Sequence, residues 1–364
     1  MKFRLILFIA LVLKGIVCMA GDFVPGRGVN IAHWLSQCYY KDIPKSEFVT
    51  ADDFKEIARQ GFDHVRLPID EKELWNADDT RNKDVFGILH AGIRNAIKSG
   101  LKVVVDLHIV HAHDFNAGAE GRTNSLWSSE KDQEHLCSLW KDLSDELHEY
   151  GNADVAYEIM NEPVAPDHEA WNKLVAKVYG VIRSREKSRT IVVGSNMWQQ
   201  TATFEHLRVP AGDDNIMLSF HFYEPYFFTH YRAGWTEQKD FGGTVHYPGE
   251  IVTADELATM TGRDRQLAEG WVTVWDRQRI KDNVMKAKKK ADELGLGLYC
   301  GEFGVYSRVP EADALRWLGD LTGVLDELGI SWALWNYKDG GGFGLRDMRT
   351  GEWHTRFVDT LMHR

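Results

Sequence analysis

The sequence is short of cysteine and proline. It holds 4 cysteines and 9 prolines in 364 residues, which excludes a disulfide-built scaffold and a proline-rich chain. Beyond residue 20 only Cys38, Cys137 and Cys300 remain, so at most one bridge can form, and we predict none. Stability must therefore come from a packed apolar core, which a hydrophobic content of 44% allows.

Positively charged residues are outnumbered, with 43 Lys and Arg against 54 Asp and Glu, so the formal net charge is −11 at pH 7. The charged residues are spread along the chain and form no basic stripe of the kind that a phosphate backbone requires. Nucleic acid is therefore not an expected partner. No Ser/Gly/Pro-rich linker and no short repeat divides the sequence. We predict a single catalytic domain over residues 21–364.

One continuous apolar run stands near the N-terminus. Basic residues precede Leu5–Leu13, and the small residue Ala20 follows. This order predicts a secretory signal peptide over residues 1–20. The run is too short to span a bilayer comfortably, and Lys14 interrupts it. The mature protein is expected to be secreted or periplasmic, without contact with a membrane.

Short apolar runs alternate with helix-period segments, which is typical of a parallel sheet covered by helices. The clearest helix is Ala51–Gln60, with Thr50 as its N-cap and Gly61 at its C-terminal end. The alternation predicts the α/β class and a (β/α)8 TIM barrel, with a doubly wound open sheet as the alternative. The predicted strands are Arg27–Ile31, His64–Leu67, Lys102–His108, Asp154–Met160, Thr190–Gly194, Asn215–His221, Gly297–Glu302 and Ile330–Trp335.

The longest interruption of this alternation is Tyr226–Arg277, which is rich in Trp, Tyr, Gly and Asp and has no clean periodicity. We predict an elaborated loop after the sixth strand. In a barrel, the loops at the C-terminal ends of the strands build the active site. This loop is therefore expected either to close one end of a binding cleft or to lengthen it.

Polar residues end nearly every predicted strand. Glu162 follows the fourth strand and Glu302 ends the seventh. Two carboxylates on opposite sides of a barrel mouth can converge on a glycosidic bond, where one donates a proton and the other attacks. Arg66 is expected to hold Glu302 ionised, and that negative charge should keep Glu162 protonated. The other strand-end residues are His108, Asn161, His221, Tyr223 and Trp335.

Two motifs carry a resemblance to a known family. The run Asn161–Glu162–Pro163 after a strand, followed about 140 residues later by Gly301–Glu302–Phe303–Gly304, resembles glycoside hydrolase family 5, the cellulase family. Each motif alone occurs by chance, but their order and their strand-end positions together are specific. The resemblance covers the whole barrel. It implies a retaining β-glycosidase with neither metal nor organic cofactor.

The same resemblance implies the roles of individual residues. Glu162 would be the general acid/base and Glu302 the nucleophile. Arg66 and Tyr223 would orient Glu302, and Asn161 would hydrogen-bond the sugar 2-hydroxyl. The remaining implied positions are His221 beside Glu162, His108 at the sugar hydroxyls and Trp335 as the floor beneath the sugar ring.

Aromatic residues are plentiful enough for a sugar cleft, since the chain holds 13 tryptophans. Most tryptophans of any barrel lie in its core. Trp34, which follows the first strand, is the first candidate for a further subsite, and Asn30 at the end of that strand is a candidate for binding or orienting the substrate. Weaker candidates are Trp75, Trp127, Trp198 and Trp235.

Two other functions remain open. His108, His111 and His113 are spaced so that alternate side chains share a face, which suggests a metal-dependent hydrolase. No clear Asp/Glu partner set accompanies them. A barrel that only binds carbohydrate is disfavoured, because both glutamates are present.

The expected partner is a β-linked polysaccharide or oligosaccharide. Family members share one catalytic set and differ in their loops, so the substrate is less certain than the reaction. We expect an endo-β-1,4-glucanase-like activity on a β-linked glucan. A β-mannanase and an exo-β-glucosidase are the alternatives.

Overall fold

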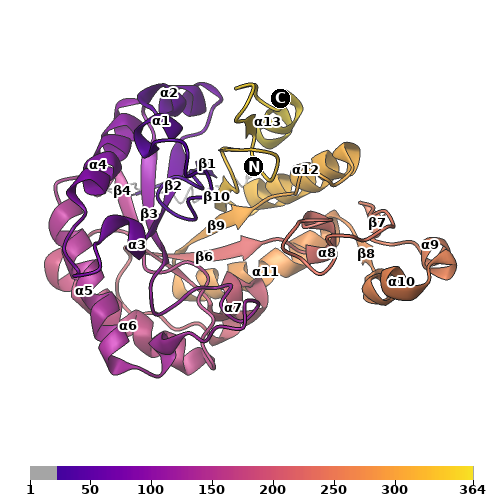
Figure 1. The fold of residues 1–364 in the computed structure, drawn as a ribbon. Helices are drawn as coiled ribbons and strands as arrows, with labels where there is room; N and C mark the ends of the chain where they lie inside the picture. Colours follow the sequence, from indigo (N-terminus) through magenta and orange to yellow (C-terminus); the bar gives the residue numbers. More distant parts are fainter. Residues whose placement is uncertain (1–22, 364) are drawn as a thin grey trace, which may run out of the picture.

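The computed structural model describes residues 23–363. The predicted signal peptide, residues 1–20, lies outside the described residues. Parallel strands close into a barrel in the order β1-β10-β9-β6-β5-β4-β3-β2 (Figure 1). The (β/α)8 barrel is confirmed. An open sheet is excluded because the eight strands pair in an unbroken ring, in which β1 pairs with both β2 and β10.

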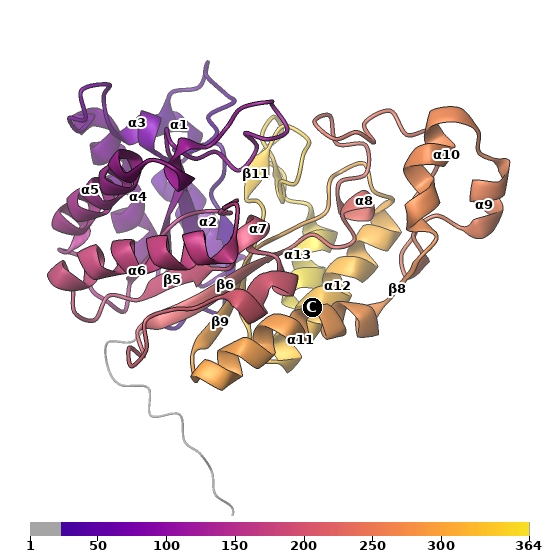
Figure 2. The same ribbon diagram turned by 90° about the horizontal axis from the view of Figure 1, so that it is seen from below.

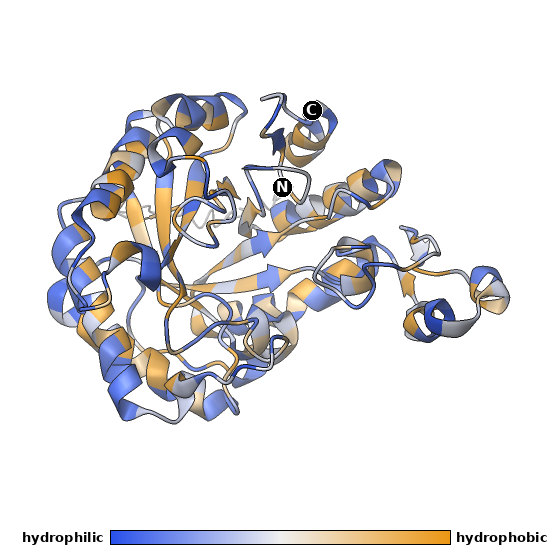
Figure 3. Ribbon diagram, viewed as in Figure 1, coloured by the Kyte–Doolittle hydropathy of each residue, from blue (hydrophilic) through white to orange (hydrophobic). Residues whose placement is uncertain are grey.

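All eight barrel strands coincide with predicted ones, apart from a few residues at their ends. Their centres are buried, as expected of parallel strands covered by helices. Figure 3 shows them mainly in the orange of apolar residues. The strands are β1 (Arg27–Asn30), β2 (His64–Asp70), β3 (Lys102–Ile109), β4 (Val155–Glu158), β5 (Ile191–Gly194), β6 (Ile216–Phe222), β9 (Gly297–Phe303) and β10 (Ser331–Leu334).

Helices cover the outside of the barrel, with polar faces toward solvent (Figures 1 and 3). The long ones are α2 (Ala51–Arg59), α4 (Lys83–Lys98), α5 (Glu130–Leu147), α6 (His168–Arg185), α11 (Arg277–Leu294) and α12 (Glu311–Glu327). The shorter elements are α1 (Lys45–Phe48), α3 (Glu71–Leu74), η1 (Ser125–Trp127), α7 (Asn196–Gln199), η2 (Thr201–His206), β11 (Lys338–Asp339), β12 (Arg346–Asp347) and α13 (Thr355–Met362). In the described part of the chain, no helix is both long and apolar enough to cross a membrane.

The predicted ends of α2 are confirmed. The Asp53 carboxylate accepts a hydrogen bond from the backbone N–H of Thr50 at 2.8 Å, as part of a capping box. Gly61 has a φ of 97°, a left-handed conformation that glycine adopts without steric cost. The chain therefore leaves α2 sharply and enters β2 three residues later.

Side chains inside the barrel lie in layers. Val104 of β3 is in register with Ala156 of β4, and both belong to an apolar cluster inside the barrel. Because strand side chains alternate with a period of two, the next inward pair toward the C-terminal ends is Asp106 and Glu158. The interior thus changes from apolar to charged within two residues. The charged layer is the base of the barrel mouth.

The segment between β6 and α11 projects away from the barrel (Figures 1 and 2). An elaborated loop after the sixth strand is confirmed, but it carries more secondary structure than its lack of periodicity suggested. Phe227 stacks on Trp271 with ring centroids 5.3 Å apart, so the segment has its own apolar contacts. Its elements are α8 (Tyr226–Thr229), the antiparallel pair β7 (Gly249–Glu250) and β8 (Val274–Trp275), α9 (Ala254–Thr259), α10 (Gly262–Ala268) and η3 (Glu269–Trp271).

The prediction that Trp34 forms a sugar subsite is wrong. Its side chain is only 3% exposed, and its indole N–H donates to the backbone oxygen of Lys45 at 2.7 Å. The ring lies beside Phe54 and directly over Gly92 of α4. His33, the preceding residue, has a φ of 62°, a left-handed turn that the sequence did not reveal. Trp34 is a core residue between the barrel and its helices.

This packing predicts opposite effects for two alanine substitutions in one helix. A Cβ at Gly92 would stand 2.5 Å from the Trp34 ring, whereas a Cβ at Gly87 meets nothing within 4 Å. We expect Gly92→Ala to lower the free energy of unfolding by about 1–3 kcal/mol through overpacking. Gly87→Ala should raise it by roughly 0.5–1 kcal/mol through helix propensity. Urea unfolding measures both, and equal effects would contradict the described packing.

Candidate active site

Arg66 is the centre of a buried ionic network at the barrel mouth. Its guanidinium contacts Glu158 and Glu302 at 2.7 Å each and Asp106 at 3.0 Å. The Arg66 side chain is 0% exposed. Charges removed from water are tolerated only when they are paired and hydrogen-bonded. One cation therefore fixes three carboxylates from three other strands.

Two asparagines complete the surroundings of Arg66. Asn30 accepts a hydrogen bond from Arg66 at 3.0 Å and donates to the backbone oxygen of Gly301 at 2.9 Å. Asn161 accepts from Arg66 at 2.9 Å through its side-chain oxygen. Its side-chain nitrogen is buried and has no partner among the described residues. Asn30 thus has a positioning role, while Asn161 keeps a donor free for a ligand.

Glu162 and Glu302 face each other across His221. The His221 Nδ1 lies 2.8 Å from the nearer oxygen of Glu162 and 3.6 Å from an oxygen of Glu302. One oxygen of each carboxylate lies within 4.8 Å of the other. Tyr223 donates its hydroxyl hydrogen bond to Glu302 at 3.1 Å. Glu302 is therefore held by two donors, Arg66 and Tyr223.

The surroundings favour protonation of Glu162 over Glu302. Burial, followed by the neighbouring charge of Glu302, raises the pKa of Glu162 well above its ordinary value. Burial also raises the pKa of Glu302, but Arg66 and then His108 oppose that rise. Burial lowers the pKa of His221 well below its ordinary value, and Arg66 adds to this effect. These shifts favour a proton on Glu162 rather than on Glu302, beside a neutral imidazole.

The side chains of His108 and Trp335 pack against each other next to the carboxylates. Their rings are stacked, with centroids 5.6 Å apart and planes inclined by 10°. The Nδ1 of His108 lies 2.6 Å from a carboxylate oxygen of Asp106. Burial lowers the pKa of His108 to about 4, so the imidazole is neutral near pH 7. All the predicted strand-end residues are thus brought together at one mouth.

The sequence of residues 24–341 matches the family Cellulase (glycosyl hydrolase family 5). The chain belongs to this family. It is 29% identical over 317 residues to Endoglucanase C of Acetivibrio thermocellus, covering 85% of this chain and 90% of that protein. It is 30% identical over 308 residues to Cellodextrinase A of Ruminococcus flavefaciens, covering 84% and 83% of the two chains. The family membership makes the protein a glycoside hydrolase.

Solved structures show the same fold. A structure of Thermotoga maritima Cel5A, described as a complex with cellobiose, superposes with a TM-score of 0.74 at 25% identity. The superposition covers 93% of this chain and 97% of that one. A further solved structure, described only as an endoglucanase, has a TM-score of 0.75 at 22% identity and covers 93% and 97% of the two chains.

Three residues of this family 5 site were not among the sequence candidates. Asp106 and Glu158 lie inside apolar strand runs, and a carboxylate in a buried strand is a signal that could have found them. Gln199 donates to Glu158 at 3.0 Å. It reaches the site from α7, where Met197, Trp198 and Gln199 itself have left-handed backbones. No local pattern marks such a segment.

The histidine cluster does not converge. His108 lies against Asp106, and His111 lies 2.6 Å from Glu71. His113 accepts a hydrogen bond from the backbone N–H of Val164 at 3.2 Å. Within residues 23–363, no close group of metal-ligating side chains contains two of these histidines. The spacing that suggested a metal hydrolase therefore reflects three separate contacts.

The remaining tryptophan candidates divide between core and surface. Trp75 is 5% exposed and donates to Asp142 at 2.9 Å, so it cannot stack on a sugar. Trp127 is partly buried and lies edge-on to His113, with ring centroids 5.2 Å apart. Trp198 is 37% exposed and Trp235 is 63% exposed. Only these last two present much aromatic surface.

The network predicts that removal of Arg66 destabilises the fold in a pH-dependent way. Arg66→Met leaves buried carboxylates without their cation, so we expect a loss of about 3–5 kcal/mol in the free energy of unfolding at pH 7. Burial already raises the pKa of Asp106 to about 7, against the opposing effect of Arg66. A carboxyl with a raised folded-state pKa favours folding when protonated, and this contribution is lost as pH rises. The loss should therefore be smaller near pH 5.

Arg81→Met is the matched control. Arg81 also contacts two carboxylates, Asp142 and Glu146, but its side chain is 32% exposed. Its removal should cost about 1 kcal/mol or less. Urea unfolding at pH 5 and pH 7 measures both variants. A loss for Arg66→Met that is no larger than the control, or that grows toward low pH, would contradict this reading of the network.

Proposed function

We propose that this glycoside hydrolase is an endo-acting β-1,4-glucanase that retains anomeric configuration through Glu162 and Glu302. The observation that carries the proposal is the spacing of the two carboxylates, with oxygens within 4.8 Å. Retaining glycosidases hold their carboxyl groups about 5–5.5 Å apart, whereas inverting ones need roughly 6.5–9.5 Å to admit water. The names of the relatives, Endoglucanase C and Cellodextrinase A, support a β-glucan substrate.

In the first step a Glu302 oxygen attacks the anomeric carbon of the sugar. The bond to the leaving oxygen breaks as Glu162 donates its proton to that oxygen. Arg66 and Tyr223 fix the direction of attack, since each donates a hydrogen bond to Glu302. The products are a glycosyl ester on Glu302 and the released chain end.

The second step reverses the role of Glu162. Once Glu302 is esterified its charge is gone, so one cause of the raised pKa of Glu162 disappears. The ionised Glu162 then takes a proton from water, and the resulting hydroxide attacks the anomeric carbon. The ester bond to Glu302 breaks and both carboxyl groups return to their starting states. The neutral His221 supports Glu162 in both forms, because it lies at hydrogen-bond distance from that carboxylate.

Sugar contacts follow from the groups left open at the mouth. The side-chain nitrogen of Asn161 is a buried donor without a protein partner, which suits a hydroxyl next to the reacting carbon. The Trp335 ring offers an apolar plane to the C–H face of the sugar. His108, stacked against Trp335, keeps one ring nitrogen for a hydroxyl while the other faces Asp106.

Two runs of aromatic contacts lead away from the site, which supports binding of several sugar units. Trp335 lies edge-on to His33, and His33 packs against Tyr39, which is 66% exposed. A second run begins at Tyr223, which contacts Phe343, and Phe343 contacts Trp235, with ring centroids 6.0 and 6.3 Å apart. The exposed rings of Tyr39 and Trp235 are therefore candidate platforms for further sugar units of a β-glucan.

The test compares sugar release from soluble β-1,4-glucan, β-1,3-glucan, mannan and xylan. We expect β-1,4-glucan to be cut, with viscosity falling before much reducing sugar appears. Glu162→Ala should reduce the rate roughly 10²–10⁴-fold, and Glu302→Ala should abolish turnover. Glu205→Ala, which replaces an exposed glutamate, is the control. Cleavage of mannan alone would contradict the β-glucan substrate, and release of terminal sugar alone would contradict endo cleavage.

Azide distinguishes the two glutamates with an activated aryl β-glucoside. In Glu302→Ala, azide takes the place of the nucleophile and should give the α-glycosyl azide. In Glu162→Ala, the ester on Glu302 still forms, and azide should open it to give the β-glycosyl azide. The same azide product from both variants, or activity of Glu302→Ala in the absence of azide, would refute the assigned roles.

We also propose that the chain is exported and that residues 1–20 are removed. The proposal rests on the basic start, the apolar run and the small residue Ala20. The measurement is N-terminal sequencing of the protein secreted by an expressing cell, together with its distribution between cells and medium or periplasm. A mature protein that begins at Gly21 is expected. Retention of Met1 inside the cell would contradict export.

A further inference from the structure

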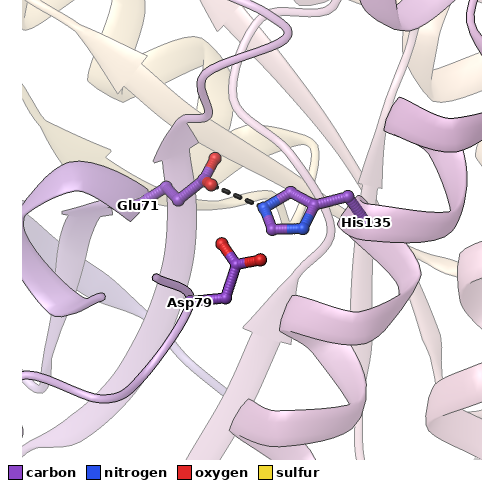
Figure 4. Close-up of side chains that lie close together, drawn as sticks. All are labelled: Glu71, Asp79 and His135. Atoms are coloured by element: carbon purple, nitrogen blue, oxygen red, sulfur yellow. Dashed lines mark hydrogen bonds and ion pairs between the residues drawn. The ribbon is translucent and has the colours of Figure 1, made fainter. Parts of the chain in front are cut away.

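A second group of carboxylate and imidazole side chains lies outside the active site. Glu71 begins α3, directly after β2, and its side chain is 2% exposed. His135 comes from α5, and Asp79 comes from the turn between α3 and α4. Figure 4 shows the Asp79 carboxylate pointing toward the gap between Glu71 and His135. Three separate segments therefore direct ligand-type atoms to one point.

The ligand-type atoms of the three side chains lie close together. The Nε2 of His135 lies 2.6 Å from Glu71 Oε1, and one ligand atom each from Glu71, Asp79 and His135 lie within 4.8 Å of one another. The carboxylate of Asp79 has no hydrogen bond or ion pair with any residue in the described range 23–363. Asp79 is thus an unpartnered carboxylate beside the Glu71–His135 pair.

A fourth residue holds Glu71 in place. The backbone N–H of His111 donates to Glu71 Oε2 at 2.7 Å, and the His111 Nδ1 lies 2.6 Å from Oε1. A carboxylate oriented by hydrogen bonds is what a metal ligand requires, and such supporting contacts are characteristic of metal sites.

We propose that Glu71, Asp79 and His135 bind a zinc ion that joins the end of β2 to the α3–α4 turn and to α5. Zinc accepts carboxylate oxygen and imidazole nitrogen at about 2.0–2.2 Å, usually with four ligands. Water would supply the fourth. Calcium and magnesium prefer sites made of oxygen alone, so an imidazole ligand favours zinc over both.

Binding requires a small rearrangement. Ligand atoms on a tetrahedral zinc stand roughly 3.4 Å apart, so the 2.6 Å contact between His135 and Glu71 must open and Asp79 must approach. His135 would bind through the Nε2 lone pair and carry its proton on Nδ1. That nitrogen has no partner among the described residues.

The proposed ion has a structural role that is independent of the glycosidase assignment. Glu71 follows the strand that carries Arg66, and His111 follows the strand that carries Asp106. A bridge from these strand ends to α5 would restrict the loops on one side of the mouth. The other close group of possible ligands, Glu162, His221 and Glu302, belongs to the site already described.

The experiment measures zinc binding to the full mature chain after treatment with a chelator and dialysis. Calorimetric titration should give one zinc ion per chain, and zinc should raise the Tm by several degrees. Asp79→Asn and His135→Gln should each weaken binding by at least roughly 10-fold, since outer partners alone change affinity by about 10–100-fold. Calcium and magnesium should leave the Tm unchanged.

Asp78→Asn is the matched control in the same turn. Asp78 accepts hydrogen bonds from Thr80, including one at 2.6 Å, and an asparagine oxygen can accept them too. This variant should bind zinc like the wild type. Absence of stoichiometric binding, or equal binding by all three variants, would overturn the proposal. Zinc that is lost only in Glu302→Gln would place the ion at the active site and overturn it as well.

Discussion

The contact of one buried guanidinium with three carboxylates is the interaction on which the mouth of this barrel depends. Arg66 on β2 reaches Asp106 on β3, Glu158 on β4 and Glu302 on β9. The desolvation of four charged groups is costly, and it is offset only while the whole set is in place. The network therefore ties together strands far apart in sequence, and Arg66 also opposes the rise that burial causes in the pKa of Glu302. The same side chains therefore contribute both to the stability of the barrel and to the electrostatics of the site.

The layering of the barrel explains why that network can exist. The apolar layer that includes Val104 and Ala156 closes the interior beneath the charged residues. In such surroundings charges interact more strongly than in water, so Glu302 has a large influence on the protonation of Glu162. The segment after β6 projects from the barrel and takes no part in this base. A common reaction can thus be combined with different substrates.

Much of the barrel and its mouth could be predicted, because the signals are local. Apolar runs mark parallel strands, and a polar residue at the end of a strand must face the mouth. Glu162 and Glu302 were found in this way. Trp34 was placed wrongly because the left-handed turn at His33 rotates it into the core. Gln199 was missed because its position depends on an irregular backbone. The direction in which a turn points a side chain cannot be read from the hydrophobic periodicity of the sequence.

Ring closure also constrains the order in which the molecule can form. Arg27 of β1 is paired with Trp332 of β10, so the first strand gains its second neighbour only when the last strand has been made. Until then two strands have unpaired edges, which are prone to bind other chains. Such long-range pairing slows folding, because a large loop must close before the contact forms. A growing or truncated chain that lacks residues beyond 302 would remain an open sheet with unpaired edges. Such a sheet tends to aggregate, so the chain would depend on chaperones to stay soluble.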